Sequence, residues 1–476
     1  MTRFTSVFTV AVLFVLILSC SKRGEEYANT PPDTFIVFES INLTGDARLT
    51  SNVRLSWYGI DEDGYIEGYE ISLDNKTWNY TTTHDSIFSF DIPAGSDSAD
   101  ITFYVRAVDN DSLRDPEPAF LAVPIKNSPP TAQFSDAEIP QSAPGAASYE
   151  WNYDDPDGRE TVTGAFIKIN DGDWSPFNLN SQLFSVVPEN PAQPGSQNAK
   201  IYLGTDNEES LTLNGFVNND SNTVYIKVID RADAESRVDT SQTVFFQQPT
   251  GDLLVVGGQP NTVRNVYFDV LNEVYPQYDY LNYSSGSRLP RYWDPTFKLI
   301  LRNYEKVFFF SGDDLMTNAA TNQTGLLLGF AAPAISDFTA AGGRILISTR
   351  FNESHDLSSV TGVLAIDELV SGPAASENMP PDSLLLPQTA GLPELKPQNF
   401  VFGINPFVPS ADASEYYTAQ FNNHPQWSAN TIAAARTGGD GRINEVLFNT
   451  ELYRFTGDTD KLEQLFDKLY NDVFER

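Results

Sequence analysis

Apolar and polar residues alternate in short runs over the first half of the chain, from about residue 31 to residue 247. Val53–Trp57, Tyr69–Leu73 and Ile101–Val108 change character at nearly every second position, which is the period of a half-buried β-strand. Turn residues such as Asp61–Gly64 separate these runs, and no helical period lies between them. The pattern predicts short strands joined by turns, arranged as β-sandwiches.

Landmarks of the first sandwich recur further along the chain. Trp151 follows Trp57 by 94 positions (151 − 57), and the turn Asp155–Gly158 follows Asp61–Gly64 by the same interval. An internal duplication is the interpretation that we favour. It predicts two sandwich domains, residues 31–126 and residues 127–248.

The two copies end alike but differ in the middle. Tyr225–Asp230 in the second copy matches Tyr104–Asp109 in the first, and a Pro-Pro pair opens each copy at residues 31 and 129. Between the landmarks the second copy is longer. The extra residues, roughly Ser181 to Leu211, are rich in Pro, Asn and Gln, so we expect a long inserted loop there.

The pattern changes at about Gly251. Continuous apolar runs now alternate with segments of helical period, which predicts a doubly wound parallel sheet covered by helices over residues 249–476. The expected strands are Asp252–Gly258, Lys306–Gly312, Arg344–Ser348, Ile432–Ala435 and Glu445–Phe448. The expected helices are Val263–Tyr275, Phe297–Asn303, Gly325–Ala341 and Asp460–Phe474. Residues 372–397, rich in Pro, Ser and Leu, are expected to pass over one edge of the sheet as a surface excursion.

These patterns resemble known families. Trp57 with the turn after it, and the late strand Tyr104–Asp109, resemble the fibronectin type III and immunoglobulin-like families, as do their equivalents in the second copy. The opening strand with its glycines, Phe308–Gly312 and Ala341–Ile347 resemble the class I glutamine amidotransferase-like superfamily, which is flavodoxin-like. The expected fold class is therefore multidomain, with two β-sandwiches followed by an α/β domain.

Composition limits the possible binding partners and the cellular location of the protein. The 476 residues include 64 acidic and 30 basic side chains, a formal net charge of −34. Such a charge repels phosphate, so we expect no nucleic acid partner. The only cysteine is Cys20, which leaves no internal disulfide. It follows Arg3 and the apolar stretch Val7–Leu18, so residues 1–19 are predicted to be a secretory signal peptide.

Ile17–Cys20 resembles the lipobox of bacterial lipoproteins. The resemblance implies lipidation of Cys20, anchorage in a membrane, and a polar tether over residues 20–30. Because Ser21 rather than aspartate follows the cysteine, it also implies delivery to the outer membrane of a Gram-negative cell envelope.

Acidic residues gather in the loops that a sandwich of this type brings to one end. They are Asp61, Asp63, Asp109 and Asp111 in the first copy and Asp155, Asp157, Asp230 and Asp233 in the second. Calcium takes six to eight oxygen ligands in loose geometry, so these loops are candidate calcium sites. Asp-x-Asp-Gly also forms turns without any metal, and that alternative stays open.

The amidotransferase resemblance does not extend to the catalytic residues. The family's nucleophilic cysteine would fall in the turn that begins at Ser348, and its His-x-Glu pair matches Asn449–Glu451, where only the glutamate is present. Without a thiolate and its base there is no activated nucleophile. The alternative catalytic set is Ser348 with His355, Asp313 and Glu451. Asp313–Asp314 is equally well explained as a helix N-cap, and Gly257–Gly258 as a tight turn.

We therefore predict a cell-envelope lipoprotein without catalytic activity, in which two sandwiches present a degenerate amidotransferase-like domain to an unknown envelope protein or glycan. Calcium is the one possible cofactor. The alternatives are an envelope hydrolase acting on glycan or peptide material, and a surface carbohydrate-binding protein.

Overall fold

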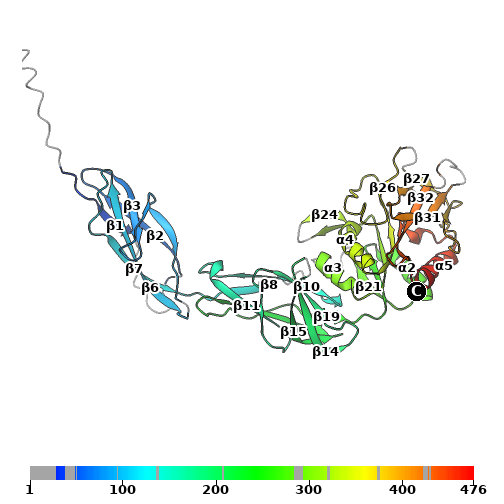
Figure 1. The fold of residues 1–476 in the computed structure, drawn as a ribbon, viewed down its shortest axis with the longest axis horizontal. Coiled ribbons are helices and arrows are strands. Elements are labelled where there is room, and N and C mark those ends of the chain that lie inside the picture. Colours follow the sequence, from blue (N-terminus) through cyan, green and yellow to red (C-terminus); the bar gives the residue numbers. More distant parts are fainter. Residues whose placement is uncertain are drawn as a thin grey trace, which may run out of the picture. The chain divides into compact units, whose positions relative to one another are not determined.

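The computed structural model describes most of the chain (Figure 1). The described residues are 28–37, 49, 51–93, 95–135, 139–205, 208–283, 293–318, 322–372, 376–421, 427 and 430–475. The predicted signal peptide, the lipidation site Cys20 and most of the tether lie outside them. None of the described helices is both long enough and apolar enough to cross a membrane.

The chain divides into two compact units. The first contains residues 1–130 with two later loops, Asp155–Val162 and Asp230–Ala234, and the second contains the remainder. The prediction of a multidomain chain with β-sandwiches is confirmed for both units.

The first unit holds a seven-stranded sandwich. Its first sheet has the order β1-β2-β5 and its second has the order β4-β3-β6-β7. The strands are β1 (Asp33–Val37), β2 (Asn52–Ile60), β3 (Ile66–Ser72), β4 (Asn79–Thr81), β5 (Asp85–Ser89), β6 (Ser98–Asp109) and β7 (Ala119–Lys126). Trp57 is 2% exposed and packs against the rings of Tyr69 and Phe103. The tryptophan is therefore a core residue, as its position in an alternating strand predicts.

The second unit begins with the second sandwich. A five-stranded sheet, β15-β14-β13-β10-β8, accompanies the sheets β12-β11-β17-β18 and β16-β19-β9. The strands are β8 (Thr131–Phe134), β9 (Ser142–Pro144), β10 (Ala147–Asp154), β11 (Val162–Ile169), β12 (Ser175–Phe177), β13 (Leu183–Pro188), β14 (Gly195–Leu203), β15 (Glu208–Asn218), β16 (Ser221–Asn222), β17 (Val224–Asp230), β18 (Asp239–Thr240) and β19 (Val244–Gln247).

The prediction of a loop at residues 181–211 is wrong. These residues form β13, β14 and the start of β15, which extend the five-stranded sheet. Phe184 and Ile201 are fully buried, so the insertion adds core. Asn190, Pro191, Gln193 and Pro194 lie in the turn between β13 and β14, and Gln197 of β14 hydrogen-bonds the backbone of Asn190 and Gln193 in that turn.

The C-terminal domain is built on an eight-stranded sheet with the order β21-β20-β22-β25-β33-β32-β31-β28. Its strands are β20 (Leu253–Gly257), β21 (Tyr278–Asn282), β22 (Lys306–Gly312), β25 (Arg344–Thr349), β28 (Leu384–Pro387), β31 (Ala413–Gln420), β32 (Asn430–Thr437) and β33 (Ile443–Phe448). The first five strands in that order are parallel. In chain order they follow the 2-1-3-4-5 arrangement of flavodoxin-like folds.

The expectation of a wholly parallel sheet is wrong. β32 pairs antiparallel with β33, and β31 and β28 continue antiparallel beyond it. The physical reason is the connection between β32 and β33, Gly438–Arg442, because a link this short allows only a hairpin, whereas a parallel crossover needs a dozen residues or more. The predicted excursion is also corrected, since residues 384–387 of it form the outer strand β28.

Two helices cover each face of this sheet (Figure 1). α2 (Asn261–Val274) and α5 (Thr459–Lys468) pack with Leu253 and Phe308, whereas α3 (Trp293–Leu301) and α4 (Leu327–Ala340) pack with Leu254 and Phe309. Successive residues of a strand point to opposite faces, so a strand covered on both faces is apolar throughout.

Short elements complete the domain. They are the hairpin β23 (Leu315–Asn318) with β24 (Gln323–Leu326), the strands β26 (Glu368–Leu369), β27 (Glu377–Met379), β29 (Val401–Ile404) and β30 (Phe407–Val408), a 3-10 turn (Leu452–Arg454) and a π-helical turn (Leu469–Val473). The second sandwich contacts this domain through Ser148 Oγ, which lies 2.5 Å from Thr296 Oγ1 of α3.

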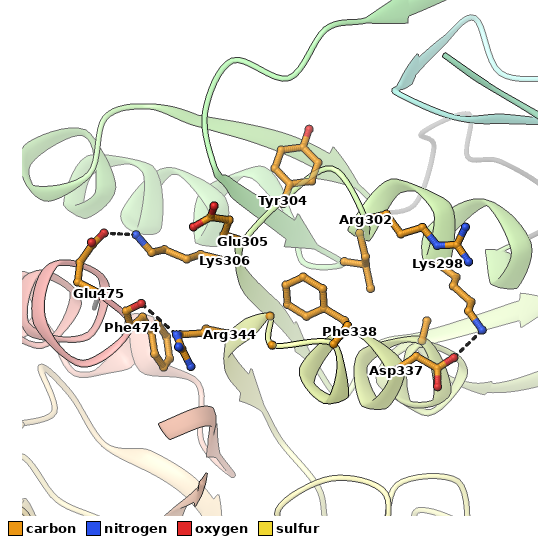
Figure 2. Close-up of a pocket in the computed structure, with 15 residues that line it drawn as sticks. Lys298, Arg302, Tyr304, Glu305, Lys306, Asp337, Phe338, Arg344, Phe474 and Glu475 are labelled. Carbon is orange, nitrogen blue, oxygen red and sulfur yellow. Dashed lines mark hydrogen bonds and ion pairs between the residues drawn. The ribbon is translucent and has the colours of Figure 1, made fainter. Parts of the chain in front are cut away.

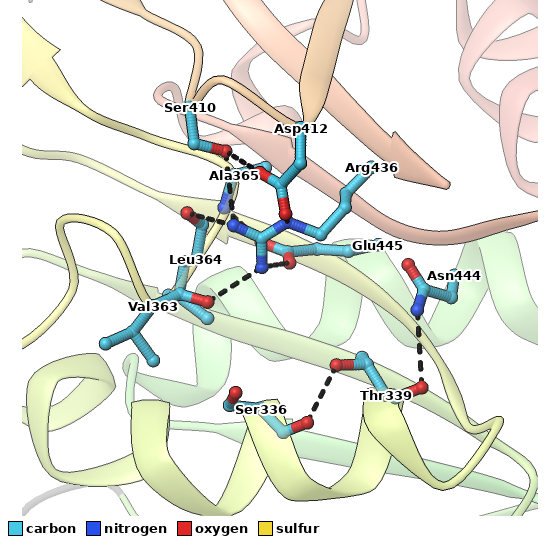
Figure 3. A network of polar contacts seen from close by, with 10 residues as sticks. All are labelled: Ser336, Thr339, Val363, Leu364, Ala365, Ser410, Asp412, Arg436, Asn444 and Glu445. Atoms are coloured by element: carbon cyan, nitrogen blue, oxygen red, sulfur yellow. Dashed lines mark hydrogen bonds and ion pairs between the residues drawn. The ribbon is translucent and has the colours of Figure 1, made fainter. Parts of the chain in front are cut away.

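A partly buried arginine holds the loops that flank the excursion against the antiparallel strands (Figure 3). Arg436 of β32 donates to the carbonyls of Val363 and Leu364, each at 2.7 Å, and pairs with Glu445 of β33 at 3.1 Å. Burial raises the pKa of Glu445, and the Arg436 guanidinium opposes that rise. The network fixes the loops on either side of the excursion to the middle of the sheet.

Candidate functional site at the carboxyl edge of the sheet

The carboxyl ends of four neighbouring parallel strands bring polar residues together. β20 is followed by Gly258 and Gln259, β22 by Asp313 and Asp314, β25 by Arg350, and β33 by Asn449 to Glu451. β20 and β22 are the strands between which the chain order reverses, and ligands of doubly wound folds bind outside the carboxyl ends of the strands at that point.

Glycines allow the close approach of these strand ends. Gly312 has a left-handed backbone with φ of 55°, and a Cβ placed on it would lie 2.7 Å from Nε2 of Gln259 and 3.0 Å from Oε1 of Glu451. A Cβ on Gly258 would lie 2.4 Å from a Leu327 methyl carbon and 3.1 Å from Oδ2 of Asp314. Larger residues would separate the polar side chains.

Gln259 and Glu451 form the buried centre of this edge. They are 6% and 4% exposed, and Gln259 Nε2 donates to Glu451 Oε1 at 2.6 Å. Glu451 Oε2 accepts a second hydrogen bond from Nε of Arg454 at 2.5 Å. The Glu451 carboxylate is therefore fixed from both sides, whereas the Gln259 carbonyl oxygen has no hydrogen-bond partner in the described part of the chain.

Asp314 lies beside this pair and is partly buried. Burial raises the pKa of Asp314 to about 7, and the charges of Asp313 and Glu451 add to the rise. Its Oδ2 atom also lacks a partner among the described residues. No helix begins at Asp313–Asp314, since β23 follows, so the N-cap alternative is wrong.

The Ser348 hydroxyl links neighbouring segments of this edge through hydrogen bonds. Its hydroxyl is 3.2 Å from the Tyr267 hydroxyl, donates to the Thr450 carbonyl at 3.1 Å, and accepts from the Leu452 amide at 3.1 Å. The residue is 1% exposed. These bonds tie β25 to the turn after β33.

His355 does not join Ser348. Its Nδ1 accepts from the Asn352 amide at 3.3 Å, and its side chain lines a cavity of about 360 Å³ with Glu353 and Asp367. Asn449, at the position of the family's histidine, is buried and accepts from the Phe351 amide at 2.6 Å. The structure therefore gathers Asp313 and Glu451 of the predicted catalytic set and leaves the Ser348–His355 pair without a hydrogen bond within the described residues.

The opposite, amino edge of the sheet has a cavity of about 760 Å³ (Figure 2). Two of its cations, Lys306 and Arg344, are held by neighbouring groups of the protein. Lys306 pairs with Glu475 and, at 3.2 Å, with Asp252, while Arg344 donates to the Phe474 carbonyl at 3.1 Å. Lys306 and Arg344 therefore offer little free charge to a ligand despite the volume of the cavity. The same contacts hold Phe474 and Glu475 against the sheet.

The acidic loops of the sandwiches form a repeated hydrogen-bonding device, which we call the linker clasp. In the first copy, Asn29 Nδ2 donates to Asp109 at 2.6 Å, and the Thr30 amide and hydroxyl donate to Asp63 at 3.0 and 2.9 Å. The second clasp uses the same residue types. Asn127 Nδ2 donates to Asp230 at 2.6 Å, and the Ser128 amide donates to Asp157 at 2.5 Å.

Other carboxylate oxygens in these loops accept from nearby backbone amides. Asp109 Oδ1 accepts from Asp111 and Leu113, and Asp230 Oδ1 from Ala232 and Ala234, all at 2.8 to 2.9 Å. Asp233 has a left-handed φ of 66° in the same turn as Asp230. Turn formation is thus part of what these residues do.

Among the described residues, no group of three or more acidic, histidine or cysteine side chains is arranged to hold a metal ion. Asp61 Oδ2 is a buried oxygen without a hydrogen-bond partner in the described part of the chain. Burial raises the pKa of Asp61, and the charges of Asp63 and Asp109 contribute. Calcium at these loops stays a prediction.

The chain matches no protein-family model and no curated protein. Solved structures that match about half of it are fibronectin III-like and immunoglobulin-like β-sandwich proteins. The fibronectin(III)-like modules of Clostridium thermocellum CbhA are 12% identical, with a TM-score of 0.16, over 45% of this chain and 95% of that chain. A two-domain fibronectin type III segment of chicken tenascin is 14% identical, with a TM-score of 0.19, over 45% and 98%.

A glycan-binding example is also among the matches. SGBP-B of the Bacteroides ovatus mixed-linkage glucan utilization locus, solved with a mixed-linkage heptasaccharide, is 11% identical, with a TM-score of 0.15, over 48% of this chain and 52% of that chain. These scores carry no argument about function.

Proposed function

We propose that this chain is a cell-envelope lipoprotein that binds a ligand or partner without catalysing a reaction. The lipobox-like Ile17–Cys20 supports anchorage in the outer membrane. The flavodoxin-like order of the five parallel strands supports a degenerate amidotransferase-like domain at the C-terminus.

The observation that carries the proposal is the state of Ser348. Ser348, the serine of the segment in which the family's nucleophile would fall, makes three hydrogen-bond contacts inside the protein. A nucleophile needs an exposed oxygen and a base within hydrogen-bond reach. Ser348 is 1% exposed, and within the described residues its contacts are a tyrosine hydroxyl, a carbonyl and an amide, none of which is a base.

Labelling with a fluorophosphonate tests this assignment. We expect the full-length protein to remain unlabelled, and Ser348→Ala to lower the melting temperature because two backbone groups and the Tyr267 hydroxyl each lose a partner. Ser354→Ala, an exposed serine in the following loop, is the matched control and should leave the melting temperature unchanged. Labelling of the wild type that disappears in Ser348→Ala would overturn the non-catalytic assignment.

Anchorage is tested independently. We expect cells expressing the full chain to incorporate labelled palmitate into the protein and to retain it in the outer-membrane fraction. Cys20→Ser should lose both. Retention of the label in Cys20→Ser would contradict the lipoprotein assignment.

A second candidate function, an envelope hydrolase, is favoured by one observation. A carboxyl group that keeps its proton near pH 7 beside a second carboxyl is the arrangement of a general acid and its partner, and Asp314 with Glu451 has this character. Release of reducing ends or peptides from envelope glycan by the wild type, lost in both Asp314→Asn and Glu451→Gln, would establish it.

A further inference from the structure

Two buried acceptors at the carboxyl edge lack donors. Buried polar atoms in folded proteins are nearly always hydrogen-bonded, and an unpaired one costs about 1–3 kcal/mol. Gln259 Oε1 and Asp314 Oδ2 have no partner within the described residues. The orientation of the Gln259 amide is fixed, because its nitrogen donates to Glu451, so the free atom is the carbonyl oxygen.

An unpaired donor lies at the same edge. Arg350 follows β25, and its backbone amide donates to the Gly312 carbonyl at 3.0 Å. Its guanidinium makes no hydrogen bond or ion pair within the described residues and is partly exposed. The same Gly312 is close to Gln259 and Glu451, since a Cβ on it would lie 2.7 Å from Gln259 Nε2 and 3.0 Å from Glu451 Oε1, so the backbone of Arg350 adjoins the buried pair.

An exposed aromatic pair adjoins this polar group. Phe400 and Phe402 are 52% and 64% exposed, and their ring centroids are 6.0 Å apart with 25° between the planes. The next residue, Gly403, approaches the arginine, since a Cβ on it would lie 3.8 Å from Nη2 of Arg350. Gln398, two residues before the pair, donates its amide to the Arg454 carbonyl at 3.0 Å.

We propose that the carboxyl edge binds a neutral oligosaccharide, whose hydroxyl groups pair with Gln259, Asp314 and Arg350 while one sugar face packs on Phe400 and Phe402. Each hydroxyl is both donor and acceptor, so one ligand satisfies groups of both kinds. The carbon-bound face of a sugar ring covers aromatic surface. Phosphorylated or acidic ligands are disfavoured by the carboxyls of Asp313, Asp314 and Glu451. The inference rests on the proposed binding function.

The test uses the full-length protein in detergent on an array of neutral oligosaccharides: β-glucan, xylan, α-mannan and starch fragments. We expect binding to at least one class. Titration calorimetry with that glycan should show affinity reduced about tenfold or more in Phe400→Ser/Phe402→Ser, and also reduced in Arg350→Gln. Phe120→Ser, which changes an aromatic residue 70% exposed on the first sandwich, is the matched control and should bind as the wild type does.

Other results overturn the inference. Binding to none of these glycans, or binding that neither the phenylalanine nor the arginine variants weaken, contradicts the site. A rise in melting temperature with millimolar α-amino acids alone, lost in Arg350→Gln, contradicts the ligand class. Chromatography of the bound glycan separates this from the proposed function: shortened products would contradict the non-catalytic assignment while leaving the ligand class intact.

Discussion

Two acidic regions of this protein differ in how their oxygen atoms are used. In the linker clasps of the sandwiches, Asp157 and Asp230 accept hydrogen bonds from backbone amides and an asparagine through both carboxylate oxygens. At the carboxyl edge of the C-terminal sheet, Gln259 and Asp314 each keep a buried oxygen without a donor in the described residues. The carboxylates of the clasps are bonded to neighbouring parts of the chain, whereas the edge has buried acceptor oxygens without donors in the described residues.

The difference shows that a gathering of carboxylates does not by itself mark a binding site. The sandwich loops carry the more conspicuous acidic sequence, but their oxygens are largely occupied by the protein's own donors. The edge residues are dispersed over the chain, from Gln259 to Glu451. A structural cluster differs from a candidate site in whether each polar atom already has a hydrogen-bond partner in the protein, and only the fold determines this.

Breaking the clasp should have the largest effect. Asp157 is 1% exposed and accepts from the amides of Ser51 and Ser128 at 2.9 and 2.5 Å. We expect Asp157→Ala to lower the free energy of unfolding by about 2–4 kcal/mol, because two amides lose their acceptor. Urea unfolding measures the loss, and faster hydrogen exchange at the Ser51 and Ser128 amides would localise it.

The matched control is Asp63→Ala in the first clasp. Asp63 is exposed and accepts from Thr30, so solvent can replace the lost bonds, and we expect little change in the free energy of unfolding. Equal losses in the two variants would contradict the distinction between a buried and an exposed clasp.

The second prediction concerns pH. The pKa of Asp314 is raised to about 7, so the folded protein holds a proton that the unfolded chain releases above about pH 4. This contribution to stability is present at low pH and falls as the pH rises from about 4 to about 7. Asp314→Asn removes it, and we expect the difference in melting temperature, variant minus wild type, to increase across that interval and then level off.

The neighbouring carboxyls of Asp313 and Glu451 and the buried Glu445 are present in both proteins, so their contributions largely cancel in the difference. Asp313→Asn, which alters an exposed neighbour, should change the profile less. A difference that is flat between pH 4 and pH 7 would show that Asp314 is ionised throughout.

The smallest expected effect is that of calcium on the first sandwich. If Asp61 Oδ2 contributes to a cation site, calcium at ten times its dissociation constant should add about 1.4 kcal/mol, observed as a higher melting temperature after EDTA treatment and calcium addition. Asp61→Asn should abolish the rise, and magnesium should reproduce little of it. No rise at 10 mM calcium would assign these loops to turn formation alone.

Periodicity predicted most elements of this fold. The strands β20, β22, β25 and β33 and the helices α2, α4 and α5 lie where buried apolar runs and helical spacing place them, because a doubly covered strand and an amphipathic helix have distinctive patterns. The turn Gly438–Arg442 contains three glycines and Asp440, which is a hairpin signal. The apolar content of the neighbouring strands, taken alone, predicts strands of the parallel sheet instead.

The candidate site could be predicted only in part. Asp313 is a candidate because it follows a buried strand, and Glu451 because it matches the glutamate of the family's His-x-Glu pair. Gln259 belongs to no motif, and its burial depends on Gly312 and Glu451 lying beside it. Phe400 and Phe402 alternate with apolar Val401, and alternation favours placing the larger rings in the core. The structure buries Val401 instead, a choice of face that depends on the pairing of β29 with β27.

The repeated clasp has a mechanical consequence. Tension along the chain reaches the first sandwich through Asn29 and Thr30, which are bonded to Asp109 at the end of β6 and to Asp63 in the loop between β2 and β3. The force therefore acts on two loops before it acts on β1. The strand carries no load until the hydrogen bonds of Asn29 and Thr30 break. A chain held at one end and loaded at the other would yield first at its clasps, extending by a short segment while each sandwich remains folded.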